Sequence, residues 1–243
     1  MKRIFAALVL VLLAAAGPAH AQSSIVAQIA GDKAASPKLY FSLKFGLNFA
    51  YLSGTPDTGR TGGFNAGLTA TIRLSDRLSL VPEITPFSSK GVSGIPLDTT
   101  GDAALDPFFA DLKSSELGLS YTDVPVLVVY RLGRIGLGAG PYAGLLSTAR
   151  ETFVAKGPGP VTGGPETAPD LKYTRRVTPS YKSTDVGLVF EGSWTITKPR
   201  RGVGLVFHFR YQAGLVDVLR TPSPSGPLRN SVIQAYLSFP FVY

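Results

Sequence analysis

The sequence predicts an all-β fold, namely an eight-stranded antiparallel up-and-down transmembrane β-barrel. Three observations lead to this prediction: eight segments of alternating polarity, connections that are alternately long and short, and an N-terminal export signal. Alternation with a period of two is what a strand with two different faces requires. An even number of such segments, each about ten residues long, with long loops on one rim only, is typical of outer-membrane barrels.

The N-terminus has the layout of a secretory signal peptide. Two basic residues precede an apolar run over residues 4–16, and small residues ending at Ala21 form the expected cleavage site. The run is shorter than the ~20 apolar residues that a transmembrane helix needs. We therefore expect residues 1–21 to be a cleaved signal peptide. Residues 22–38 are predicted to be a flexible lead-in, and residues 39–243 the barrel domain.

Alternation of polarity defines each strand in turn. Residues 39–52 begin the series, with apolar and aromatic side chains at every second position. Turn-forming residues separate the strands, and the long connections cover residues 53–62, 91–117, 148–182 and 217–229. The eight predicted strands cover residues 39–52, 63–74, 78–90, 121–131, 135–146, 185–196, 203–215 and 230–243.

Two strands carry special features. Pro82 and Pro86 each remove a backbone donor from the third strand, which indicates a β-bulge there. The strand over residues 135–146 is rich in glycine on one face, and we interpret these glycines as room for bulky neighbours inside the barrel. A helix is disfavoured in this region because each glycine would cost up to about 1 kcal/mol in a helical interior.

The charged face distinguishes two kinds of barrel. A soluble lipocalin-type barrel would turn the apolar face inward around a ligand. The face that we interpret as the inner one carries four acids and four bases, which are tolerated in a wet lumen where they pair and would be very costly in a lipocalin core. We therefore predict that the apolar face meets lipid. The predicted lumen charge network consists of Lys44, Arg73, Glu83, Asp123, Arg131, Asp185, Glu191 and Arg210.

Aromatic residues on the apolar face gather where the strands meet the tight turns. Such residues form belts at membrane–water interfaces. The predicted aromatic girdle consists of Phe41, Tyr130, Trp194, Phe241 and Tyr243.

Several short motifs within the predicted strands and turns are specific enough to compare with known families. They are Leu-Ser-Asp-Arg at residues 74–77, Pro82-Glu83, Asp123-Val124-Pro125, Gly140-Pro141-Tyr142 and Gly214-Leu215-Val216-Asp217. In these motifs, and over nearly the whole mature chain, the sequence resembles the PorT-type outer-membrane β-barrel family, which is common in Bacteroidetes and their relatives, although Pro86 departs from the family pattern. The resemblance implies an eight-stranded barrel in the outer membrane of a Gram-negative bacterium, and it implies little about activity, since only some relatives serve protein secretion.

Few residues offer catalytic or metal-binding chemistry. His208 is the one histidine left after cleavage, and the chain has no cysteine, so a zinc site is not expected. A lipid-modifying enzyme would need a histidine beside a serine and a carboxylate at the outer rim or on the lipid face. His208 is predicted to lie mid-strand and inward. We therefore predict no enzymatic activity and no cofactor.

The net charge and the C-terminal residues indicate which partners to expect. The net charge of +8 becomes +6 when Lys2 and Arg3 are removed, and we interpret the basic excess as facing anionic lipid head groups or loop solvent. The expected partners are outer-membrane lipids, lipopolysaccharide, other envelope proteins and the barrel assembly machinery. Residues 239–243 resemble the C-terminal aromatic signal by which that machinery recognises barrel precursors. Nucleic acid is not expected outside the cytoplasm.

The favoured function is that of a structural or interaction protein with a plugged lumen, acting through its long extracellular loops. The alternatives are a narrow porin-like pore, a secretion-accessory barrel and, least favoured, a lipid-modifying enzyme. The basic segment over residues 148–182 is interpreted as a solvated loop, with an anion site as its alternative.

Overall fold

The computed structural model describes residues 38–55, 58–157, 169–198, 202–221, 223 and 226–242. The predicted signal peptide, all but Lys38 of the lead-in, and Tyr243 lie outside these residues. None of the helices in the described ranges is long and apolar enough to cross a membrane. The elements are β1 (Leu39–Ser53), β2 (Thr61–Arg73), β3 (Leu78–Ser93), η1 (Asp106–Phe109), β4 (Leu112–Leu132), β5 (Ile135–Ala155), β6 (Leu171–Arg176), η2 (Thr178–Ser180), β7 (Thr184–Thr197), β8 (Gly202–Val203), β9 (Leu205–Gly214) and β10 (Arg229–Val242).

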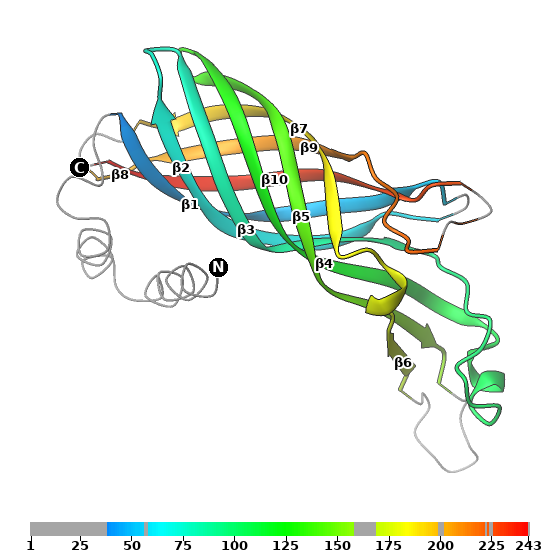
Figure 1. The fold of residues 1–243 in the computed structure, drawn as a ribbon. Coiled ribbons are helices and arrows are strands. Elements are labelled where there is room, and N and C mark those ends of the chain that lie inside the picture. Colours follow the sequence, from blue (N-terminus) through cyan, green and yellow to red (C-terminus); the bar gives the residue numbers. More distant parts are fainter. Residues whose placement is uncertain are drawn as a thin grey trace, which may run out of the picture.

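Eight of the strands close into an antiparallel ring (Figure 1). Their order around the ring is β1, β2, β3, β4, β5, β7, β9 and β10, and β10 pairs back onto β1 from Phe41 opposite Phe241 to Ser53 opposite Arg229. β8 pairs with the end of β10, and β6 pairs with β5 outside the ring. The predicted eight-stranded up-and-down barrel is confirmed.

β1 shows how the two faces of the sheet divide. Lys44 and Asn48 are buried, whereas Phe45, Leu47 and Phe49 are 45%, 56% and 45% exposed. In β4 from Val124 to Tyr130 and in β7 from Val186 to Trp194, apolar side chains are likewise exposed at every second position, with a few exceptions, and most of the positions between them are buried or half-buried. The apolar rows therefore point away from the barrel axis and the polar rows point into the lumen.

The bulge expected in the third strand lies at Pro86. The register shifts between Thr85 and Ser88 against β4, and β3 contributes one extra residue there against β2 as well. Pro82, by contrast, stays in register opposite Val126. The extra residue turns Phe87 outward and brings the positions after it, including Lys90, onto the inner face.

The prediction of irregular loops on both sides of the β4–β5 hairpin is wrong in part. β4 already begins at Leu112, β5 continues to Ala155, and β6 pairs antiparallel with β5 from Arg150 opposite Arg176 to Ala155 opposite Leu171. We call residues 112–120, 147–155 and 171–176 the extension, which projects from the ring at its long-loop end (Figure 1). Its strands form because they bury an apolar face, and the rings of Phe153 and Tyr173 stack 6.2 Å apart there.

Gly140 allows the close approach of β4 to β5. A Cβ atom at this position would overlap the backbone oxygen of Val126, whereas a Cβ at Gly192 in β7 would meet open space. We expect Gly140→Ala to destabilise the barrel by about 1–3 kcal/mol through overpacking. Gly192→Ala is the matched control. The measurement is the fraction of refolded protein with a heat-dependent mobility shift on a gel, and equal fractions for both variants would contradict this account.

Candidate functional site in the barrel lumen

Arg210 on β9 is the centre of a first ion-pair cluster in the lumen. Its guanidinium donates a bidentate pair of hydrogen bonds to Glu83 on β3, with Nη1···Oε2 and Nη2···Oε1 distances of 2.9 and 2.7 Å. The Nε atom donates to Glu191 Oε2 at 2.8 Å. Lys44 donates to Glu83 Oε2 at 2.6 Å. Both carboxylates of this cluster therefore accept hydrogen bonds from buried cations.

Aromatic rings complete the first cluster. The hydroxyl of Tyr236 accepts a hydrogen bond from Arg210 at 2.6 Å and donates one to Glu191. The ring of His208 stacks on that of Tyr236, with 4.4 Å between centroids and 4° between planes. Its Nδ1 lies 2.9 Å from Glu191 Oε1, and its Nε2 lies 2.8 Å from Ser238 Oγ. Both ring nitrogens of His208 thus face partners inside the lumen, and neither faces lipid.

Lys90 on β3 is the centre of a second cluster. Its ammonium donates to Asp123 Oδ1 at 3.1 Å and to Asp185 Oδ2 at 3.0 Å, and its side chain has no exposed surface. The rings of Tyr121 and Tyr142 also lie close to it, each with its centroid 4.6 Å from Nζ. Ser88 and Gln212 also donate to Asp123 Oδ2, and Tyr142 and Asn230 also donate to Asp185 Oδ2, while Asp185 Oδ1 is buried without a hydrogen-bond partner.

Lys90 was not among the predicted lumen charges because of the bulge at Pro86. Strict alternation from Glu83 through Thr85 places residue 90 on the lipid face. The extra residue in β3 reverses that alternation after Thr85, so that Ser88 and Lys90 both point inward. Pro86 was a usable signal for the bulge. If the alternation is reversed after this residue and then continued along the strand, Lys90 is placed in the lumen.

The expectation that all eight predicted network residues pair with one another needs correction. Six of them lie in the two clusters, but Arg73 and Arg131 do not. Arg131 donates to the hydroxyl of Tyr40 at 3.2 Å, and the guanidinium of Arg73 lies 5.5 Å from the centroid of the same ring. Among the described residues neither arginine forms an ion pair with a carboxylate, because both lie nearer the short turns than Glu83 does.

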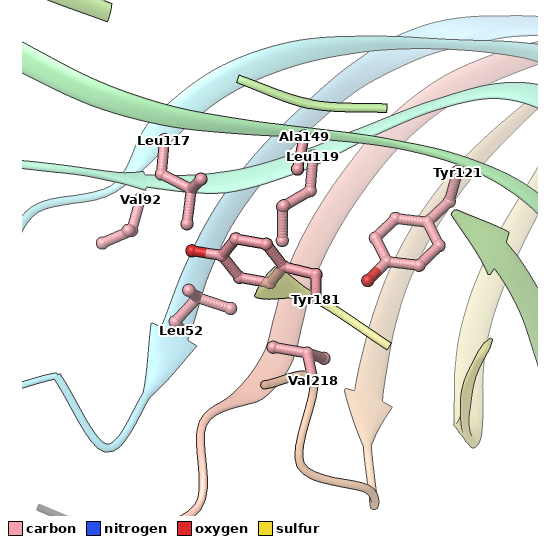
Figure 2. Packing of buried hydrophobic residues seen from close by; sticks show 8 residues of the cluster. All are labelled: Leu52, Val92, Leu117, Leu119, Tyr121, Ala149, Tyr181 and Val218. Carbon is pink, nitrogen blue, oxygen red and sulfur yellow. The ribbon is translucent and has the colours of Figure 1, made fainter. Parts of the chain in front are cut away.

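An apolar plug closes the long-loop end of the lumen (Figure 2). Tyr181, from the connection after β6, lies among side chains of β1 and β4 and of the segment after β9. The short-turn end instead contains a cavity of about 70 Å³, lined by polar and apolar residues of every strand in the ring. The buried members of the apolar plug are Leu52, Val92, Leu117, Leu119, Tyr121, Ala149, Tyr181 and Val218.

The residues of the predicted girdle lie on the outer face near the short turns. Phe41 is opposite Phe241, and Tyr130 and Trp194 are exposed, while Tyr243 lies outside the described residues. A second group of outward aromatic residues lies at the long-loop end and was not predicted as a girdle. Alternation alone already placed four of its members on the apolar face, and the bulge adds the fifth. The second group consists of Phe49, Tyr51, Phe64, Phe87 and Tyr211.

These arrangements favour a closed polar interior over a reactive one. Within the described part of the chain there is no group of three His, Asp or Glu side chains that could hold a metal ion. The buried carboxylates are held by cations and hydroxyl or amide donors, which is how buried charge is stabilised in proteins. The lumen charges therefore stabilise the barrel by linking strands that are not neighbours in the ring.

The closed ring and its exposed apolar belt define a small outer-membrane β-barrel. The family model of the outer membrane protein beta-barrel domain matches residues 22–220, and the chain belongs to this family. No curated protein matches the chain.

Several solved barrels are similar to the chain at low identity. The attachment invasion locus protein Ail of Yersinia pestis, crystallised with the heparin analogue sucrose octasulfate, is 9% identical with a TM-score of 0.41, over 84% of this chain and 99% of that one. Neisserial surface protein A is 14% identical with a TM-score of 0.39, over 83% and 96%. The N-terminal barrel domain of Pseudomonas aeruginosa OprF is 9% identical with a TM-score of 0.28, over 82% and 97%.

Replacing Lys90 tests whether the second cluster stabilises the barrel. Lys90→Met keeps the length of the side chain but leaves Asp123 and Asp185 without their cation, which costs about 3–5 kcal/mol for a buried pair. Lys113→Met is the matched control, since Lys113 forms an exposed ion pair with Asp170 that contributes at most about 1 kcal/mol. The measurement is urea unfolding in lipid vesicles followed by the fluorescence of Trp194. Similar midpoints for both variants would refute the structural role of Lys90.

Proposed function

We propose that the protein is a closed, non-conducting outer-membrane barrel that acts as a structural or interaction protein through its long-loop end. In outer-membrane barrels the short turns face the periplasm and the long loops face the cell exterior. The extension and the connections around η1 would then be the part that other molecules at the cell surface can reach.

The single observation that carries the proposal is the filled lumen. Two ion-pair clusters, centred on Arg210 and Lys90, and the apolar plug occupy successive levels between the short turns and the long loops. A ring of eight strands leaves an interior only just wide enough for side chains. This filling favours a plugged barrel over the porin-like pore that is its alternative.

The extension supports an interaction role. Its outer surface presents Arg150, Lys172, Thr174 and Arg176 to solvent, and the tip beside η1 exposes Leu105 and Phe108 at 41% and 52%. An ordered, exposed surface that combines cationic and apolar side chains suits contacts with lipopolysaccharide or with other envelope proteins. The cationic segment that was interpreted as a solvated loop is therefore in part an ordered strand.

Finer parts of the proposal rest on the sequence. The PorT-type resemblance keeps a secretion-accessory role as an alternative, and export with cleavage after Ala21 and recognition by the assembly machinery belong to the same proposal. The two groups of outward aromatic residues would mark the membrane interfaces. The inward position of His208, away from lipid, supports a barrel without lipid-modifying activity.

Conductance measurements test the closed lumen. In planar bilayers we expect the purified, folded protein to give no current steps, because charged and apolar side chains fill the path. A general porin reconstituted in the same way is the positive control, and the heat-dependent gel shift verifies folding. Reproducible steps that vanish after heat unfolding would establish the pore instead.

Photo-crosslinking in intact cells tests the interaction surface. A crosslinking amino acid at Thr174, on the exposed face of β6, is expected to give adducts with envelope proteins or lipopolysaccharide. The same amino acid at Ala143, on the outer face of β5 within the apolar belt, is the control and should give no protein adduct. Adducts at Ala143 alone would place the working surface within the membrane and contradict the proposal.

A further inference from the structure

His208 on β9 has the hydrogen-bond partners of a general base. Its Nδ1 lies 2.9 Å from Glu191 Oε1 on β7, and its Nε2 lies 2.8 Å from Ser238 Oγ on β10. A histidine that contacts a serine hydroxyl through one nitrogen and a carboxylate through the other is the arrangement by which many hydrolases activate a serine nucleophile. The hydrogen bonds that hold His208 in the closed lumen are therefore also the ones that this chemistry requires.

Neighbouring side chains fix the orientation of these three residues. Glu191 Oε2 accepts a hydrogen bond from Arg210 Nε at 2.8 Å and another from the hydroxyl of Tyr236, while Oε1 contacts His208. The ring of Tyr236 stacks on the imidazole and holds its plane. A carboxylate beside Nδ1 favours the tautomer with the proton on that nitrogen, so Nε2 is left to accept the proton of Ser238.

The cavity at the short-turn end gives room for a substrate beside the serine. Glu191, His208 and Ser238 all line it, and the side chain of His208 is 15% exposed although it faces the lumen. Its lining also includes Arg131 and Pro240, close to the ends of β4 and β10 at the short turns, which face the periplasm in such barrels. Since about 10–15 Å³ holds one water molecule, a cavity of about 70 Å³ has room for an acetyl ester but not for a long acyl chain.

Side chains must stabilise the oxyanion of the reaction, because the backbone N–H groups of the barrel wall are paired across the sheet. Arg131 lines the cavity and donates to the hydroxyl of Tyr40 at 3.2 Å. A guanidinium carries several N–H groups, so Arg131 can donate both to Tyr40 and to an oxyanion in the cavity. The hydroxyl groups of Ser42 and Thr69 line the same space and are further donors.

We propose that this site hydrolyses small, water-soluble acetyl esters that enter from the short-turn end. Ser238 Oγ attacks the carbonyl carbon and gives its proton to His208 Nε2, and the alcohol leaves with that proton as the ester C–O bond breaks. A water molecule then attacks the acetyl-serine in the same way, which releases acetic acid and restores both residues. The activity goes beyond the proposed function, which concerns the opposite end of the barrel, and it needs no histidine on the lipid face.

Turnover of ethyl acetate by the refolded protein in detergent tests the activity, with ¹H NMR as the measurement. We expect Ser238→Ala to lower kcat/KM by at least about 100-fold, because the nucleophile is lost. Ser231→Ala is the matched control, since Ser231 is a buried serine on the same strand whose hydroxyl contacts Tyr211 instead. The heat-dependent gel shift verifies that each variant folds. Equal rates for the two variants would overturn the proposal.

Covalent labelling separates a reactive serine from a structural one. Methanesulfonyl fluoride should modify Ser238 in the folded protein but not Ser231, as read from peptide masses, and absence of the Ser238 adduct would overturn the proposal even if Ser238→Ala does not fold. His208→Gln, whose amide can still hydrogen-bond, should slow the labelling by at least about 100-fold; an unchanged rate would refute the role of His208. Ethyl hexanoate should react more slowly than ethyl acetate, and equal rates would overturn the assignment to acetyl esters.

Discussion

The hydrogen bonds between β1 and β10 are the constraint on which the rest of the structure depends. In hydrocarbon, unpaired backbone groups cost several kcal/mol each, so a sheet in the membrane must close. A ring of only eight strands brings the inner side chains of opposite strands into contact. Arg210 on β9 can therefore reach Glu83 on β3 across the lumen. The ionised residues of the interior then gather into clusters, because an isolated charge there would be costly.

The barrel itself could largely be predicted from the sequence, because the alternation of a strand is a local property. Lys44 and Phe45 take opposite faces whatever the rest of the chain does, and the strand count follows from repeating that observation. The position of Lys90 depends on more than its neighbours. It requires knowing which residue of β3 is extra against both β2 and β4, and this is decided by pairing across the sheet.

The ion-pair partners of the lumen side chains were harder to predict from the sequence than the face of the sheet on which each side chain lies. Arg73 and Arg131 share the inner face with Glu83 and Glu191, but the register of the strands places them at a different level, beside Tyr40. The extension was missed for a similar reason. Its strands are stabilised by contacts such as that between Phe153 and Tyr173, which lie on separate strands and give no local signal.

Closure of the ring also determines when the barrel can form. Phe41 and Phe241 are partners although they lie on the first and the last strand of the ring, so the sheet cannot close before the last strand is in place. Until then two unpaired strand edges and a broad apolar surface are available to other chains, which favours aggregation. Protection of these edges and of the apolar surface therefore comes in a single late step of folding, when the first and the last strand pair.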